Sequence, residues 1–229
     1  MARKPDNAVP SERADRDKIV EAFMALLAER RYDDIGFGDI ATRAGVPLHR
    51  CRAEFDSPIA ILAAQMREID QKVLAADDAD MAQESPRERL FDVLMRRFEA
   101  LGPHKAAVRS LTRSARCNPL LALALNGLAA RSQGWMLSAA GIDSSGLRGA
   151  MRAQGLACLY ADAMRTWLDD EDPGLARTMA ALDRSLARGA RWSRGLDDVC
   201  RLATAPCRIR RSRRERPPMN DPGEQPAVV

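Results

Sequence analysis

Residues 40–55 read IATRAGVPLHRCRAEF, and this stretch decides the fold class of the N-terminal part of the chain. It predicts two short helices joined by a tight turn. Gly45 suits the turn because glycine adopts positive φ without a steric penalty. Pro47 suits the first position of the second helix, where a missing N–H group costs nothing. We therefore expect helices over residues 37–44 and 47–55, an arrangement typical of units that bind DNA.

Longer helices are expected on both sides of this unit. Apolar side chains recur at helical spacing between residues 15 and 31 and predict a helix there. After the unit, Asp56 or Ser57 can cap a helix that Pro58 opens and that continues to residue 75. Together these segments can enclose a small core under the turn. The candidate core residues are Phe23, Leu27, Ile40, Ala41, Val46, Cys51 and Phe55.

Burial of those side chains leaves the outer face of the second short helix to solvent. Residues 43–52 contain three arginines and no acid, so this face is locally basic. Arginine can pair with guanine in the major groove, and it can also hold a phosphate. The candidate DNA-binding residues are Arg43, Leu48, His49, Arg50 and Arg52.

The rest of the chain is also expected to be helical. No run of alternating apolar and polar residues occurs, so no sheet is expected and the fold class is all-α. Prolines mark the starts of most later helices, which we expect at 86–101, 104–116, 118–140, 146–169 and 173–195. The expected organisation is a flexible arm at 1–14, a helix-turn-helix domain with connecting helix at 15–75, a ligand-binding and dimerisation domain at 76–203, and a disordered Arg- and Pro-rich tail at 204–229.

Charge and cysteine usage limit the function classes. The net charge is +4, but residues 201–216 alone hold seven arginines and one glutamate. The basic pI is therefore due to this segment and does not by itself indicate DNA binding. The five cysteines are scattered, which favours a reducing, cytoplasmic location. No signal peptide is visible, and the longest apolar run is about half of the ~20 residues that a membrane-spanning helix needs.

Residues 16–75 resemble the N-terminal domain of the tetracycline-repressor (TetR/AcrR) family of bacterial transcriptional regulators. The resemblance lies in RDKIVEAFMALLAER, in DIATRAGV, in Phe55 and in the long helix that follows. It implies a homodimer that binds a double-stranded DNA operator and responds to a small apolar or amphipathic ligand. Three positions depart from the family pattern, which has Ser or Thr at Pro47, Tyr at Arg52 and Lys near Pro58. The Tyr and Lys typically hold phosphates, and residues 11–60 carry eight basic and ten acidic residues.

A second resemblance gives an alternative function. RTWLDDEDPGLARTMAALDRSLARGARW is similar to the C-terminal helices of the ubiquinone-biosynthesis relatives of this fold, which bind isoprenoid lipids and do not bind DNA. The alternative is therefore a lipid-binding accessory protein.

The helices at 118–140 and 146–169 are rich in Leu, Ala and Met and can enclose a ligand, or they can simply form core. A neutral or cationic ligand is expected, because no Lys lies between residues 118 and 169. The candidate pocket residues are Trp135, Met136, Gln154, Tyr160, Met164 and Trp167. The candidate dimer-interface residues are Leu159, Leu175, Met179, Leu182 and Leu186, four of which form a helical stripe.

Other chemistry is not indicated. The acidic residues 169–172 fit a solvated junction in which Asp172 caps a helix better than a magnesium site. Cys51 and His49 have no partners at metal-ligand spacing. No catalytic motif such as GxSxG, HExxH or a glycine-rich phosphate loop occurs, so neither an enzyme nor a cofactor is expected.

Overall fold

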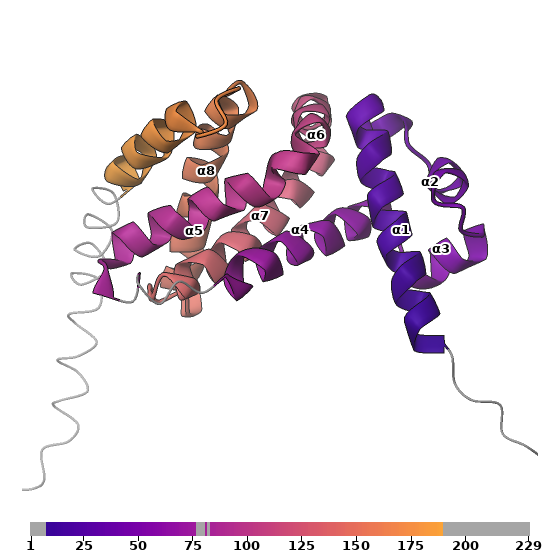
Figure 1. The fold of residues 1–229 in the computed structure, drawn as a ribbon, viewed down its shortest axis with the longest axis horizontal. Helices are drawn as coiled ribbons and strands as arrows, with labels where there is room; N and C mark the ends of the chain where they lie inside the picture. The colour runs from indigo at the N-terminus through magenta and orange to yellow at the C-terminus, as the bar shows by residue number, and fades with distance from the viewer. Residues whose placement is uncertain (1–7, 77–80, 82, 190–229) are drawn as a thin grey trace, which may run out of the picture. The chain divides into compact units, whose positions relative to one another are not determined.

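The computed structural model describes residues 8–76, 81 and 83–189, and every regular element among them is helical (Figure 1). The all-α prediction is confirmed for these residues, whereas residues 204–229 lie outside them. The longer helices are α1 (Ala8–Glu29), α4 (Pro58–Ala75), α5 (Pro86–Leu101), α6 (Lys105–Cys117), α7 (Pro119–Ala139) and α8 (Gly146–Leu168), and a further helix spans 176–189. The short ones are α2 (Phe37–Ala44), α3 (Leu48–Glu54) and the 3₁₀ turns η1 (Tyr32–Asp34) and η3 (Gly102–His104).

The start of α1 differs from the prediction. The helix begins at Ala8, inside the segment expected to be a flexible arm up to residue 14. Pro10 lies in the first turn of α1, where proline is tolerated because the N–H group it lacks has no helical partner there. Proline is therefore poor evidence for a loop when it stands at a helix start.

Helices α1, α2 and α3 form an N-terminal head around one small core. Ile19, Phe23 and Leu27 of α1 are fully buried against Ile40 of α2 and Cys51 of α3. Val46 and Phe55 close this core on either side of α3, and Ala41 is half-buried at its margin. The core predicted from helical spacing is thus confirmed.

Helix α4 connects the head to the larger helical bundle. Ser57 accepts a hydrogen bond from the Ala60 N–H at 3.3 Å, and Pro58 occupies the first turn, as predicted. The side chains of Ile61 and Leu62 join the head core, whereas Ile69 and Val73, two turns later, join the bundle core. One continuous helix therefore contributes to both hydrophobic cores.

Helix α6 fixes the head to the bundle through small polar side chains. The Ser110 hydroxyl donates to the Arg30 carbonyl at 2.7 Å, and the Tyr32 N–H donates to Ser114 Oγ at 3.1 Å. Both serines are buried, and these bonds satisfy backbone groups where α1 ends and the η1 turn begins. The 3₁₀ turn was not predicted, because its bonding partners lie about 80 residues away.

The acidic junction at 169–172 is structural. Asp172 accepts from the Ala176 N–H at 3.1 Å at the start of the helix over 176–189, as predicted for this cap, but the helix begins three residues after Pro173, which was expected to be its first residue. Asp170 is buried and accepts from both the backbone N–H and the hydroxyl of Thr178, and these bonds lower the pKa of Asp170. Asp169 pairs with Arg109 of α6. Among the described residues no cluster of potential ligands could hold a metal, and none of their helices combines the length and hydropathy that crossing a bilayer requires.

Candidate nucleic-acid interface

The turn between α2 and α3 has the conformation that the sequence predicted. Gly45 lies in the left-handed region at φ 64° and ψ 29°. Its N–H donates to the Thr42 carbonyl at 3.3 Å, and the Val46 N–H donates to the Ala41 carbonyl at 3.1 Å, which closes the end of α2. Pro47 is the N-cap residue of α3 rather than its first residue, so the helix begins at Leu48, one residue later than expected.

Helix α3 is anchored to the head by its inner face. Cys51 is completely buried, and burial raises the pKa of its thiol, so it is a core residue rather than a reactive one. Val46 and Phe55 anchor the two ends of the helix in the same core. This packing fixes the direction in which the opposite, exposed face of α3 points. A recognition helix needs such a fixed orientation to place its side chains in the major groove.

Three of the five candidate DNA-binding side chains lie on the exposed face of α3. Leu48 is 55% exposed, and both His49 and Arg52 are exposed. Among the described residues His49 forms no ion pair. Within the part of the chain that the structure describes, Arg52 pairs with Asp56 one turn later, in a contact where both side chains are largely in solvent. Such an exposed pair contributes little, so Arg52 is available to a ligand.

The other two candidates are held by carboxylates of α1. The Arg43 guanidinium donates two hydrogen bonds to Glu29, at 2.5 and 3.3 Å, and this contact lowers the pKa of Glu29. Arg50 donates from Nε and Nη2 to one oxygen of Asp15, at 3.1 and 2.9 Å. The locally basic face predicted from residues 43–52 is therefore partly neutralised by another helix.

Further ion pairs continue this pattern across the head. Arg16 lies 3.5 Å from Glu54 of α3 and also above the Phe55 ring, and Arg30 lies 3.4 Å from Asp39 of α2. Reasoning from residues 43–52 alone missed these acids. The acidic excess over residues 11–60 was the available signal, but it did not indicate which carboxylate meets which arginine.

The residues predicted to line one ligand pocket do not share one environment, which corrects that assignment. Met136 and Trp167 are packed in the bundle core, and Met164 lies partly buried beside it. Tyr160 stacks on Phe98, and burial raises its pKa to about 12. The remaining two lie at the surface, where Trp135 is 60% exposed and Gln154 exchanges hydrogen bonds with Asn126.

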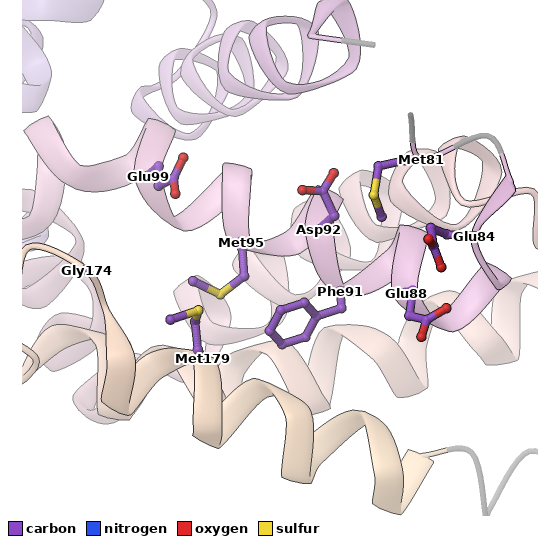
Figure 2. Close-up of a pocket in the computed structure, with 9 residues that line it drawn as sticks. All are labelled: Met81, Glu84, Glu88, Phe91, Asp92, Met95, Glu99, Gly174 and Met179. Carbon is purple, nitrogen blue, oxygen red and sulfur yellow. The ribbon is translucent and has the colours of Figure 1, made fainter. Parts of the chain in front are cut away.

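An open groove of about 490 Å³ lies elsewhere, between α5 and the segment that includes Gly174 and Met179. Figure 2 shows Met95 and Met179 close to each other beside the Phe91 ring. Carboxylates of α5 and of the residues just before it surround this apolar floor, from Glu84, Glu88, Asp92 and Glu99. No residue of the predicted pocket lines this groove.

The stripe predicted to face a partner chain is mostly buried within this chain, so that assignment is wrong. Leu182 is completely buried and Leu186 nearly so, both in the same core as Phe98 and Trp167. Leu175 packs against that core, and Leu159 is half-buried, with its Cδ1 2.5 Å from where a Cβ on Gly189 would lie. Only Met179 is exposed, at 39%, and it lines the groove.

Exposed apolar side chains lie instead on α7 and α8, which pack against each other. The Asn126–Gln154 amide pair joins the two helices at the same surface. Small residues, including Gly127 of α7 and Gly155 and Cys158 of α8, are also exposed. The large apolar side chains are Leu120, Leu123 and Trp135 of α7 and Leu147 and Met151 of α8. We call this surface the α7–α8 face.

Comparison with solved structures identifies the fold. The TetR transcriptional regulator from Nitrosomonas europaea ATCC 19718 matches with a TM-score of 0.59 and 23% identity, over 76% of this chain and 97% of that chain. A TetR transcriptional regulator from Rhodococcus sp. RHA1 matches with a TM-score of 0.55 and 20% identity, over 78% and 97% of the two chains. A tetR-family transcriptional regulator from Streptomyces coelicolor matches with a TM-score of 0.52 and 16% identity, over 83% and 88%.

These identities establish a shared fold, so the chain has the fold of TetR-type transcriptional regulators. The likeness in fold thus extends well beyond residues 16–75, because the matches cover 76–83% of this chain. No family model and no curated protein matches the sequence.

Proposed function

We propose that this chain is a dimeric, ligand-responsive regulator that binds operator DNA through α3. The observation that carries the proposal is the α2–Gly45–α3 unit, which rests on a fully packed core and presents Leu48, His49 and Arg52 to solvent. A B-DNA major groove is about 12 Å wide and admits one such helix. In this proposal Leu48 and His49 meet base edges or methyl groups, whereas Arg52 meets a phosphate or a guanine.

The dimer is proposed to form through the α7–α8 face. Operator binding by two heads requires two-fold symmetry, and a self-complementary surface provides it. Leu123, Leu147 and Met151 are large apolar side chains exposed on adjacent helices, and the glycines between them permit close approach of a second backbone. A monomer that left this surface in water would carry an apolar patch typical of an interaction site.

The groove beside α5 is proposed to hold the ligand. Phe91, Met95 and Met179 supply an adaptable apolar floor, and surrounding carboxylates favour a molecule that carries a positive charge. Binding there would bias the position of α5, which packs on α4, the helix that enters the head. The ligand regulates only if it binds the DNA-competent and DNA-incompetent arrangements with different affinity.

The test is a fluorescence-anisotropy titration of the purified protein with duplex DNA from upstream of its own gene. Arg52→Ala is compared with Arg165→Ala, because the two arginines are similarly exposed, at 70% and 76%, and Arg165 lies on α8. A base contact by Arg52 is worth about 1–3 kcal/mol on the preferred sequence, and a phosphate contact lowers the salt slope by about one on every sequence. Equal behaviour of the two variants would remove Arg52 from the interface.

The alternative, an isoprenoid-binding accessory protein, predicts a different result from the same preparation. Organic extraction followed by mass spectrometry would recover an isoprenoid or quinone, and no duplex would bind even at low salt. That pair of results would replace the regulator proposal. Specific operator binding that weakens about tenfold on addition of a ligand, or about 1.4 kcal/mol of coupling, supports it.

A further inference from the structure

Two arginines of the proposed DNA-binding face are occupied by carboxylates of the same helix. Glu29 and Asp15 both belong to α1, and they hold Arg43 of α2 and Arg50 of α3. Each arginine donates two hydrogen bonds, as it would to a phosphate. The carboxylates therefore occupy donors that a phosphate of the DNA backbone would use.

The two pairs are exposed enough to exchange partners. The side chains of Arg43 and Glu29 are 43% and 50% exposed, and those of Arg50 and Asp15 are 34% and 20% exposed. Ion pairs in water contribute about 0–1 kcal/mol, so a well-placed phosphate can displace such a carboxylate. The displaced carboxylate then lies near the DNA backbone, and its repulsion opposes binding at every sequence.

From these contacts we propose that Glu29 and Asp15 are specificity-determining residues that compete with DNA phosphates for Arg43 and Arg50. They keep affinity for random DNA low, and they release the arginines only where the duplex offers enough other contacts. The inference rests on the proposed DNA-binding function. It assigns a role to α1, whose acids lie outside the helix-turn-helix sequence itself.

Neighbouring charges determine which variant gives the clearest result. Glu29 lies between Arg43 and Arg30, and both cations lower its pKa, so its removal leaves two arginines at the end of α1. Arg30 retains its own partner, Asp39. Asp15 faces Arg50, while the adjacent Arg16 pairs with Glu54. Glu29→Gln and Asp15→Asn therefore each free one arginine and leave the other pairs of the head in place.

The experiment measures the affinity of the full chain for a random-sequence duplex over a range of about 50–200 mM salt. Each phosphate contact contributes about 0.9 to the slope of log K against log salt. Each freed arginine should therefore steepen the slope of log K against log salt by about 0.9 per head. Between 50 and 200 mM salt the affinity of the variant should then fall by about 3.5-fold more than that of the wild type. The matched control is Asp183→Asn, because Asp183 pairs with Arg87 at similar exposure, 55% and 46%, within the bundle.

A double variant tests whether the effect passes through the arginine. Glu29→Gln with Arg43→Met should return the slope to that of the wild type, because the freed donor is gone. A thermal melt followed by circular dichroism checks that each variant folds, and Glu29→Gln alone decides the matter if Asp15→Asn proves unstable.

The outcomes separate this inference from the proposed function. Steeper slopes for Glu29→Gln and Asp15→Asn but not for Asp183→Asn support it. Equal slopes for all proteins overturn the inference and leave the regulator proposal intact. Absence of binding by wild type and variants at every salt concentration overturns the proposed function and the inference with it. Equal gains in the single Glu29 variant and the double variant would show that the acid repels DNA directly and does not act through Arg43, and would also overturn the inference.

Discussion

Removal of Asp70 should destabilise the protein far more than removal of any exposed carboxylate. Asp70 of α4 accepts from Arg97 Nε of α5 at 3.2 Å and from the Ser132 hydroxyl of α7 at 2.7 Å. The side chains of Asp70 and Arg97 are only 10% and 4% exposed. In Asp70→Ala, Arg97 would keep its charge in the bundle core without a carboxylate partner. Loss of one member of a buried ion pair costs about 3–5 kcal/mol.

The Tyr160 ring offsets a small part of this cost, because the Arg97 guanidinium lies 5.1 Å from its centroid. Replacing both charged residues, as Asp70→Leu with Arg97→Met, should restore most of the stability, since no buried charge remains. The exposed ion pair between Arg87 and Asp183 in the same bundle provides a control for the buried pair. Asp183→Ala breaks the contact with Arg87 at the surface and should cost about 0–1 kcal/mol.

The measurement is urea denaturation at equilibrium, with the free energy of unfolding obtained by linear extrapolation. A domain is typically stable by about 5–15 kcal/mol, so Asp70→Ala should lose a large share of the folded-state stability. If Asp70→Ala and Asp183→Ala cost the same, or if the double variant is no more stable than Asp70→Ala, the argument from burial is refuted.

Four other changes test the structure and the proposal. Gly149→Ala should destabilise the start of α8 by about 1–3 kcal/mol in thermal melts, because its Cβ would lie 1.9 Å from the Ser144 carbonyl carbon, whereas Gly134→Ala has open space and should be tolerated. Met151→Glu places a charge on the α7–α8 face and should give folded monomers in analytical ultracentrifugation; a wild type that is monomeric at micromolar concentration would contradict the proposed dimer. Burial and Lys72 lower the pKa of His104 despite the opposing charge of Glu68, so the unfolded chain binds its proton more readily. The free energy of unfolding should therefore fall as the pH drops below about 6.5, and His104→Gln should flatten that part of the pH profile. Removal of residues 204–229 should reduce the salt slope of DNA binding without changing the preferred sequence, since six arginines between 208 and 216 can contact phosphates, and an unchanged slope would exclude that role.

The sequence by itself determined the helices and the head. Caps and prolines at Ser57–Pro58, Ser85–Pro86 and Asn118–Pro119 mark helix starts through interactions that span only a few residues. Helical spacing likewise identified the head core, because a side chain's face on a helix depends only on its position along the chain. Local rules of this kind can be applied before the fold is known.

The tertiary structure decided what each face meets. The stripe that includes Leu182 and Leu186 is equally periodic whether it packs inside the chain or against a partner, and only the fold shows that it packs inside. Residues 43–52 are basic in sequence, as predicted. The net charge of the surface that they form also depends on two carboxylates, which lie 14 residues from Arg43 and 35 residues from Arg50 along the chain. Periodicity in the sequence shows that one face of a helix is buried, and composition shows that a segment carries charge. Which residues contact the buried face, and which carboxylates neutralise the arginines, depends on distances in space. For Arg43 and Arg50 these distances are determined only by the packing of α1 against α2 and α3.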